Sequence, residues 1–185
     1  MKVIITILCL LAIKGSAYAL IDSVGVYKTS EDFKNKKLSY VVLCHGWRNK
    51  IRTHDCFGRH YITVTYNRKK ERINKSDIYG YRGCDKNDYR IFENSEYTIV
   101  NTNKFYLYTK TIQEPGDSGY CDELYFFSLK PDSKIVPMNK QNLMTAFKDN
   151  KKFVNLIDLA FKKNEDLSIS MKQYFIIKLY EQSLE

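Results

Sequence analysis

The segment KSDIYGYRGCDKNDYRIF, residues 75–92, joins two strand-like stretches through a tight corner rich in aromatic residues. Gly80 lies between Tyr79 and Tyr81 in this corner. Because glycine lacks a Cβ atom, it permits a β-bulge or the close approach of a second backbone. The two neighbouring tyrosines can cover such an approach. The segment therefore predicts a corner that shapes a sheet.

Strand-like alternation continues on both sides of this corner. In HYITVTY, residues 60–66, Ile62, Val64 and Tyr66 share one face and the two threonines share the other. The polar run NRKK that follows predicts a hairpin turn. Further strands are expected at 24–27, 71–74, 89–92, 97–101, 104–110 and 123–129. This succession predicts an antiparallel β-meander or a partly open small barrel.

Helical patterns dominate the last part of the chain. Asn139 can cap a helix. Further on, apolar residues recur at i, i+3, i+4, i+7 and i+8, which is one face of a helix. They are Phe153, Leu156, Ile157, Ala160 and Phe161. A final helix is expected over about 171–182. Strands first and helices later predict the α+β class, β-rich over 40–129 and with two or three C-terminal helices over 139–182.

The first residues resemble an export signal. Lys2 is followed by an apolar run over 3–13, and the small residues Ala17 and Ala19 suit a cleavage site. A helix needs about twenty apolar residues to span a bilayer, so this run is too short to do so. We expect a signal peptide over 1–19, a single α+β domain over 20–185, and no transmembrane segment after cleavage.

The chain is basic, with a formal net charge of +9 that falls to +7 when Lys2 and Lys14 are removed with the signal (9 − 2 = 7). The basic runs at 34–37 and 67–72 alternate with acids or lie in turn-like sequence, which is typical of a solvated surface. Nucleic-acid binding is not expected, because the charge is dispersed and export removes the chain from that partner.

Four cysteines follow the signal: Cys44, Cys56, Cys84 and Cys121. An even number in an exported chain permits disulfides, and four cysteines allow three sets of pairs. Cys44 with Cys56, or Cys84 with Cys121, are the pairs that we consider.

The three histidines lie close to two of these cysteines in sequence. His45, His54, Cys56 and His60 are residue types that bind zinc. Their spacing matches no familiar zinc motif, so incidental placement or a disulfide is the favoured interpretation, and no cofactor is expected. A hydrolase or metal-dependent enzyme that uses residues 44–60 remains the alternative function. GDSG, residues 116–119, matches the nucleophile motif of trypsin-like proteases, but the surrounding sequence does not support that chemistry.

Fifteen tyrosines are many for 185 residues. Tyrosine offers apolar area together with a hydroxyl group, so a tyrosine-rich sheet face can bind a glycan or a protein. The alternative is that these side chains cover strand edges and the rim of the core. The candidate binding residues are Tyr79, Tyr81, Arg82, Tyr89, Arg90, Tyr106 and Tyr108. No residue is assigned a catalytic role.

Several segments, taken in order, resemble a family of uncharacterised exported bacterial proteins. They are Val26-Tyr27-Lys28 with Asp32-Phe33, Ile78-Tyr79-Gly80-Tyr81-Arg82, Asp88-Tyr89-Arg90, Phe105-Tyr106-Leu107-Tyr108 and Tyr125-Phe126-Phe127-Ser128, followed by the helical pattern of Leu143, Phe147 and Phe153. The chain departs from the family at Lys86, where the glycine of an Asp-Gly turn is expected.

This resemblance implies a location in the periplasm or on the surface of a Gram-negative bacterium, and it implies no activity. Export could instead end in secretion of the protein from the cell, which is the alternative to these two locations. Together these observations predict an exported, non-catalytic binding or structural protein of the cell envelope. Its expected partner is an envelope protein or a glycan.

Overall fold

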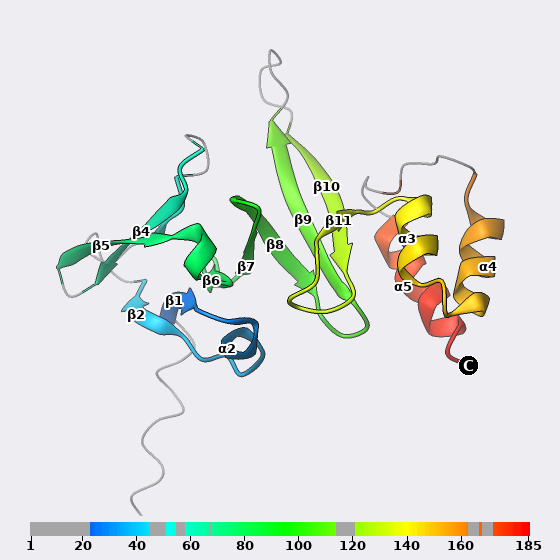
Figure 1. The fold of residues 1–185 in the computed structure, drawn as a ribbon, viewed down its shortest axis with the longest axis horizontal. Helices are drawn as coiled ribbons and strands as arrows, with labels where there is room; N and C mark the ends of the chain where they lie inside the picture. The colour runs from blue at the N-terminus through cyan, green and yellow to red at the C-terminus, as the bar shows by residue number, and fades with distance from the viewer. Residues whose placement is uncertain are drawn as a thin grey trace, which may run out of the picture.

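The computed structural model describes residues 23–44, 51–54, 58–66, 68–113, 121–162, 167 and 172–185. They form an α+β fold with two open antiparallel sheets and mostly C-terminal helices, as the sequence predicts. The smaller sheet lies at one end of the molecule and the C-terminal helices lie at the other (Figure 1). The expected signal over 1–19 and the GDSG motif over 116–119 lie outside the described residues.

The larger sheet has eight strands and contains the predicted meander. Its spatial order is β11–β10–β9–β8–β7–β6–β1–β2, and every pair of neighbours is antiparallel. The strands are β1 (Ser23–Tyr27), β2 (Ser39–Leu43), β6 (Gly80–Arg82), β7 (Asp88–Phe92), β8 (Ser95–Asn101), β9 (Tyr106–Gln113), β10 (Cys121–Ser128) and β11 (Val136–Pro137).

The smaller sheet was not expected as a separate element. It consists of β3 (Ile51–Arg52), β4 (Tyr61–Tyr66) and β5 (Lys69–Asn74), with β4 in the centre. The 3₁₀ turn η2 (Lys75–Asp77) then leads the chain away from β5 and into the larger sheet. Ile62 and Val64 of β4 are buried against a core formed by Val26, Ile78, Tyr81 and Ile91, so one face of the smaller sheet is covered by the larger one.

Gly80 confirms the close backbone approach predicted from the sequence. It pairs with Arg90 across β6 and β7. A Cβ atom built at Gly80 would lie 1.9 Å from the carbonyl oxygen of Tyr89, which is far inside van der Waals contact. Only glycine fits between β1 and β7 at this point, and both flanking tyrosines are buried.

The turn between β7 and β8 is shorter than expected. Glu93 and Asn94 are its two central residues, with φ angles of 48° and 66°. Two successive residues with positive φ form the type I′ turn that suits the twist of a two-residue hairpin. The strands expected over 89–92 and 97–101 leave four residues, 93–96, for this turn, so the observed turn is two residues shorter.

Within the described ranges, four α-helices accompany the sheets. The helix α2 (Ser30–Lys34) begins with a capping box in which Thr29 and Asp32 satisfy each other's backbone amides. The predicted cap Asn139 accepts a hydrogen bond from the backbone of Asn142 and begins α3 (Lys140–Ala146). The other two helices are α4 (Lys151–Ala160) and α5 (Lys172–Gln182). In the described part of the chain, no helix is both long and apolar enough to cross a membrane.

The C-terminal helices form the main hydrophobic core with β9 and β10. The stripe predicted on α4 is confirmed in part: Phe153, Ile157 and the C-cap Phe161 are buried and Leu156 is half-buried, whereas Ala160 is exposed. The buried residues pack in one cluster with Leu107 and Phe127 of the sheet and with Ile176 of α5. The helices therefore cover one face of the larger sheet at the end far from the smaller sheet (Figure 1).

Candidate functional site

The aromatic surface predicted from the sequence is not an open surface. Tyr79, Tyr81 and Tyr108 are buried. The helix α2 covers part of this region, where Phe33 packs against Tyr27 and Tyr79 with ring centres 5.4 Å apart in both pairs. The rings of these three tyrosines belong to the core, so they do not form an exposed aromatic face. The binding role expected of them stays a prediction.

Arg90 is also buried, with 3% of its surface exposed. Its guanidinium donates to the hydroxyl of Tyr108 at 2.9 Å and to the carbonyl oxygen of Ser133 at 2.6 Å. The guanidinium carbon lies 5.3–5.6 Å from the ring centres of Phe92, Tyr79 and Tyr108, which is the range of cation–π contacts. Arg90 thus stabilises the core, and no described carboxylate forms an ion pair with it.

The other three predicted residues are only half-buried, and each is engaged in the structure. Tyr89 stacks on Tyr81 with ring centres 4.8 Å apart, and its hydroxyl donates to Asp85. Tyr106 packs against Phe33. Arg82 binds Asp88. The seven candidates therefore do not converge on one exposed site.

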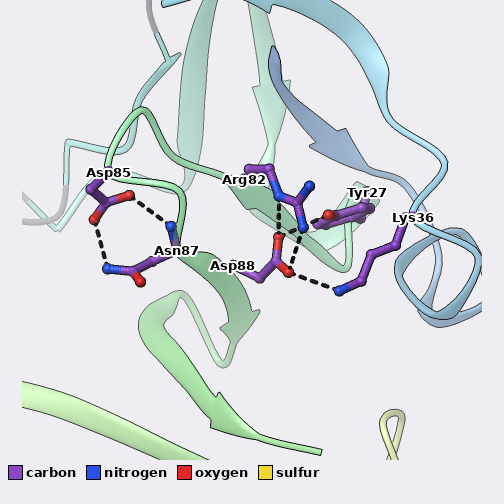
Figure 2. Close-up of polar contacts among 6 residues, drawn as sticks. All are labelled: Tyr27, Lys36, Arg82, Asp85, Asn87 and Asp88. Carbon is purple, nitrogen blue, oxygen red and sulfur yellow. Dashed lines mark hydrogen bonds and ion pairs between the residues drawn. The ribbon is translucent and has the colours of Figure 1, made fainter. Parts of the chain in front are cut away.

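Asp88 is the centre of a polar network that ties four segments together (Figure 2). Arg82 donates to both carboxylate oxygens at 2.9 and 3.0 Å. The hydroxyl of Tyr27 donates at 2.8 Å and the ammonium of Lys36 at 2.9 Å. Burial alone would raise the pKa of Asp88, but the hydrogen bonds from Arg82, Lys36 and Tyr27 outweigh it and lower that pKa. Both oxygens of the ionised Asp88 carboxylate accept hydrogen bonds from the protein. We therefore assign Asp88 a role in stabilising the fold and not in acid–base chemistry.

The neighbouring Asp85 stabilises the turn between β6 and β7. It accepts hydrogen bonds from the backbone and the side chain of Asn87 at 3.1 and 3.0 Å (Figure 2). Lys86 in this turn has a φ angle of 69°, in the left-handed region that favours glycine. A glycine, which the sequence resemblance leads us to expect at this position, would adopt this conformation without strain.

The cysteines and histidines of the enzymatic alternative are only partly described. His45 and Cys56 lie outside the described residues. His54 shares a hydrogen bond of 3.0 Å with the hydroxyl of Thr63, whereas the exposed His60 lines a cavity. Among the described residues, no group of three or more His, Cys, Asp or Glu side chains is placed to hold a metal ion.

No disulfide is found in the described part of the chain. Cys84 is exposed and carries a free thiol, so the pair considered with Cys121 does not form. Cys84 lies in the turn between β6 and β7, whereas Cys121 is the first residue of β10. The other pair, Cys44 with Cys56, includes a residue outside the described ranges.

A different candidate site lies on the outer face of the smaller sheet. The strand register pairs Arg52 with Thr63, Thr63 with Arg72, and Thr65 with Lys70. Directly paired residues of antiparallel strands lie on the same face. Because Ile62 and Val64 face the core, these residues face outward together with Tyr61. We call this surface the Tyr61 face, and it consists of Arg52, Tyr61, Thr63, Thr65, Lys70 and Arg72.

The ring of Tyr61 organises the cations around it. The guanidinium carbons of Arg72 and Arg59 lie 4.9 and 5.7 Å from its centre, and Arg59 also donates a hydrogen bond to its hydroxyl. The ring of His54 makes an edge contact at 5.5 Å. Two guanidinium groups are thus held over one aromatic ring at the surface of the protein.

The charges of the Tyr61 face are exposed and unbalanced. Arg52, Lys70 and Arg72 are exposed, and none forms an ion pair with a described residue. The acid in β5, Glu71, faces the opposite side, where it accepts a hydrogen bond of 2.9 Å from the hydroxyl of Tyr40. Three cations without described counter-charges, beside an arginine-covered ring, make a surface that attracts anions.

Comparisons with known proteins give no indication of function, so the proposal below is argued from the geometry of the Tyr61 face. A scan against protein-family models found no matching family, and searches of curated proteins and of solved structures found no match. The resemblance to exported bacterial proteins therefore stays a prediction.

The sequence contains a signal for the Tyr61 face. Taken separately, the basic run over 67–72 predicts a solvated, turn-like segment, and His60 to Tyr66 predicts a strand with a threonine face. Pairing the two segments so that Tyr66 lies opposite Lys69 puts Lys70 and Arg72 beside those threonines. The register between β3 and β4, which adds Arg52, could not be read from the sequence.

Proposed function

We propose that this chain is an exported, non-catalytic binding protein of the cell envelope that holds an anionic glycan on the Tyr61 face. The observation that supports the proposal is the set of three exposed cations, Arg52, Lys70 and Arg72, on one sheet face without a described ion-pair partner. Export and the envelope location rest on the sequence of residues 1–19 and on the family resemblance.

The geometry suits a ligand with repeated negative charges. Arg52 and Arg72 flank Thr63 on the two outer strands, so their backbones are about 10 Å apart, two strand spacings of about 4.8 Å. Guanidinium groups bind carboxylates and phosphates through two parallel hydrogen bonds. Thr63 lies between Arg52 and Arg72, and Thr65 lies beside Lys70. The hydroxyl of Thr65, and that of Thr63 beside its bond to His54, can bind sugar hydroxyls. A single small anion would engage only part of this surface.

A glycan fits this face better than single-stranded nucleic acid does. Proteins that bind single strands stack bases on exposed aromatic rings. The ring of Tyr61 is already in contact with Arg59 and Arg72, and its edge contacts His54. The face offers hydrogen-bond donors and charge but no free aromatic platform.

The test is a binding titration with polygalacturonate, a carboxylated glycan, at about 150 mM NaCl. The variant Arg52→Ala/Lys70→Ala/Arg72→Ala should bind about tenfold more weakly or worse, because it loses three charge-assisted contacts. The matched control is Lys148→Ala/Lys151→Ala/Lys152→Ala, which removes the same charge from exposed residues at the helical end of the molecule. Neutral dextran should not bind.

Three results would contradict the proposal. Equal losses in the two triple variants would show a response to net charge alone. Unchanged affinity in the Arg52/Lys70/Arg72 variant would place the site elsewhere. Tighter binding of an oligothymidylate than of polygalacturonate at the same salt concentration would identify a nucleic-acid-binding surface instead.

A further inference from the structure

His54 follows β3 in the chain and lies against the Tyr61 face. Its Nε2 atom is 3.0 Å from the hydroxyl oxygen of Thr63, and its ring makes an edge contact with Tyr61, with ring centres 5.5 Å apart. The φ angle of His54 is 57°, in the left-handed region that few residues other than glycine adopt. Such a conformation persists where the surroundings hold it, and here two residues of β4 hold the side chain.

His54 can make the charge of this face depend on pH. Histidine is the side chain whose charge ordinarily changes between pH 5 and 8. The ring of His54 is half-buried, so it stays in reach of water and can exchange protons with it. The residues that define the Tyr61 face are arginine, lysine, threonine and tyrosine, residue types whose charge does not change in this range.

The charged groups around His54 are cations. Arg59 and Arg72 lie over the ring of Tyr61 that His54 contacts. Arg52 ends β3, two residues before His54. A proton on His54 would therefore extend a surface that is already positive.

The nearest described acids point elsewhere. Glu71 lies on the opposite face of the smaller sheet, where it accepts a hydrogen bond from Tyr40. Asp77 lies beyond the end of β5, where it accepts a hydrogen bond from Asn74. Within the described ranges, no carboxylate forms an ion pair with His54. A positive charge on His54 is thus available to a bound anion.

Protonation also changes the role of the Thr63 hydroxyl. In the neutral ring, Nε2 of His54 either accepts a hydrogen bond from Thr63 or donates one to it, depending on the tautomer. In the charged ring both nitrogens carry protons, so Nε2 donates and the Thr63 oxygen accepts. Thr63 lies between Arg52 and Arg72, and its own hydroxyl proton is then free to be donated to an anion held there.

We propose that His54 makes the Tyr61 face sensitive to pH, so that the face holds its acidic glycan more tightly as the pH falls from about 8 to about 5.5. This inference rests on the function proposed above. The proton passes from solvent to a ring nitrogen of His54, whereas sugar carboxylates, which titrate below about pH 4, keep their charge throughout. A proton on His54 and a carboxylate beside Thr63 attract each other, so each strengthens the binding of the other.

The test repeats the polygalacturonate titration at pH 5.5 and at pH 8.0, with about 150 mM NaCl. The wild-type protein should bind about threefold more tightly at pH 5.5, the effect of one added charge near the surface. In His54→Asn the ratio of the two affinities should fall to about one, because asparagine tolerates the left-handed backbone and carries no charge. His60→Asn is the matched control. This exposed histidine lines a cavity away from the Tyr61 face, so its loss should leave the ratio at about three.

A measurement on the wild-type protein keeps the inference testable if His54→Asn fails to fold. The Hε1 NMR signals of His54 and His60 are followed between pH 5 and 8, without ligand and with a saturating oligogalacturonate. The ligand should move the transition of His54 to higher pH by more than that of His60, because the anion favours the charged ring of the histidine beside it.

A pH response that survives in His54→Asn, or that disappears in His45→Asn instead, would overturn the inference. A transition of His54 that the ligand does not move would do the same. If polygalacturonate binds and the Arg52/Lys70/Arg72 variant loses affinity while neither pH effect is seen, only the His54 inference fails. If polygalacturonate binds at neither pH, the proposed function fails, and the inference fails with it.

Discussion

The guanidinium of Arg72 lies over the ring of Tyr61, 4.9 Å from its centre, and both side chains project from the outer face of the smaller sheet. This contact limits the conformations of a long side chain that would otherwise move freely in solvent. A guanidinium that is held in place loses less conformational entropy when it binds an anion. The aromatic residue thus acts on binding through the arginines that it positions.

Replacing Tyr61 with leucine should weaken polygalacturonate binding about threefold, because an exposed cation–π contact contributes about 0.5–1 kcal/mol. Tyr61→Phe is the matched control, because it keeps the ring and removes only the hydrogen bond from Arg59. It should bind more tightly than the leucine variant in the same titration. Equal losses in both variants would show that the hydroxyl group, not the ring, organises this face.

Asp88→Asn should lower the free energy of unfolding by about 2–4 kcal/mol, measured by urea denaturation. The substitution removes a partly buried charge that binds Arg82, Lys36 and Tyr27, and hydrogen bonds to charged groups contribute about 1.5–3 kcal/mol each. Asp158→Asn is the control. That carboxylate is itself exposed and pairs with one cation, Lys140, at 2.8 Å, so its loss should cost about 0–1 kcal/mol. Similar losses in the two variants would contradict the central role of Asp88.

The stability of the protein should fall in acid because of the same carboxylate. The folded structure lowers the pKa of Asp88 below the value of about 3.9 in an unfolded chain. Its contribution is therefore present above pH 3.9 and is lost as pH falls through the lower, folded-state pKa. Between pH 5 and 3, the wild-type free energy of unfolding should drop more steeply than that of Asp88→Asn. Parallel curves would show that the pKa of Asp88 is not lowered on folding.

Gly80→Ala should destabilise the fold by about 3 kcal/mol or more, or prevent folding, because its Cβ atom would overlap the carbonyl oxygen of Tyr89. Gly58→Ala provides a control with the same change in side chain. Gly58 has no atom within 4 Å of the added group, but its φ angle is 59°, so alanine there should cost only about 1–2 kcal/mol. A smaller loss at Gly80 than at Gly58 would contradict the close packing of β6 and β7.

Much of the fold follows from local patterns in the sequence. The structure confirms the glycine of the aromatic corner, the alternation over 60–66, the cap at Asn139 and the buried centre of the stripe on α4, each of which has a local physical cause. The pairing of β3, β4 and β5 into a separate sheet depends on contacts between strands, so local periodicity did not reveal it.

The candidate site was harder to predict for a related reason. Alternation shows that two faces of a strand differ, but it does not show which face is covered. Tyrosines suit both surfaces and cores, and here Tyr79 and Tyr108 are buried around Arg90. The basic residues of β5 looked dispersed along the chain, and only the register with β4 places them beside Tyr61.

The most direct test of the account is to observe the arginine side chains while an oligogalacturonate of about five units is added. The Nε–Hε NMR signals of Arg52 and Arg72, assigned by single lysine substitutions, should shift in a saturable manner, whereas those of Arg82 and the buried Arg90 should not. Saturable binding that leaves the Arg52 and Arg72 signals unmoved would contradict the assignment of the Tyr61 face as the glycan site.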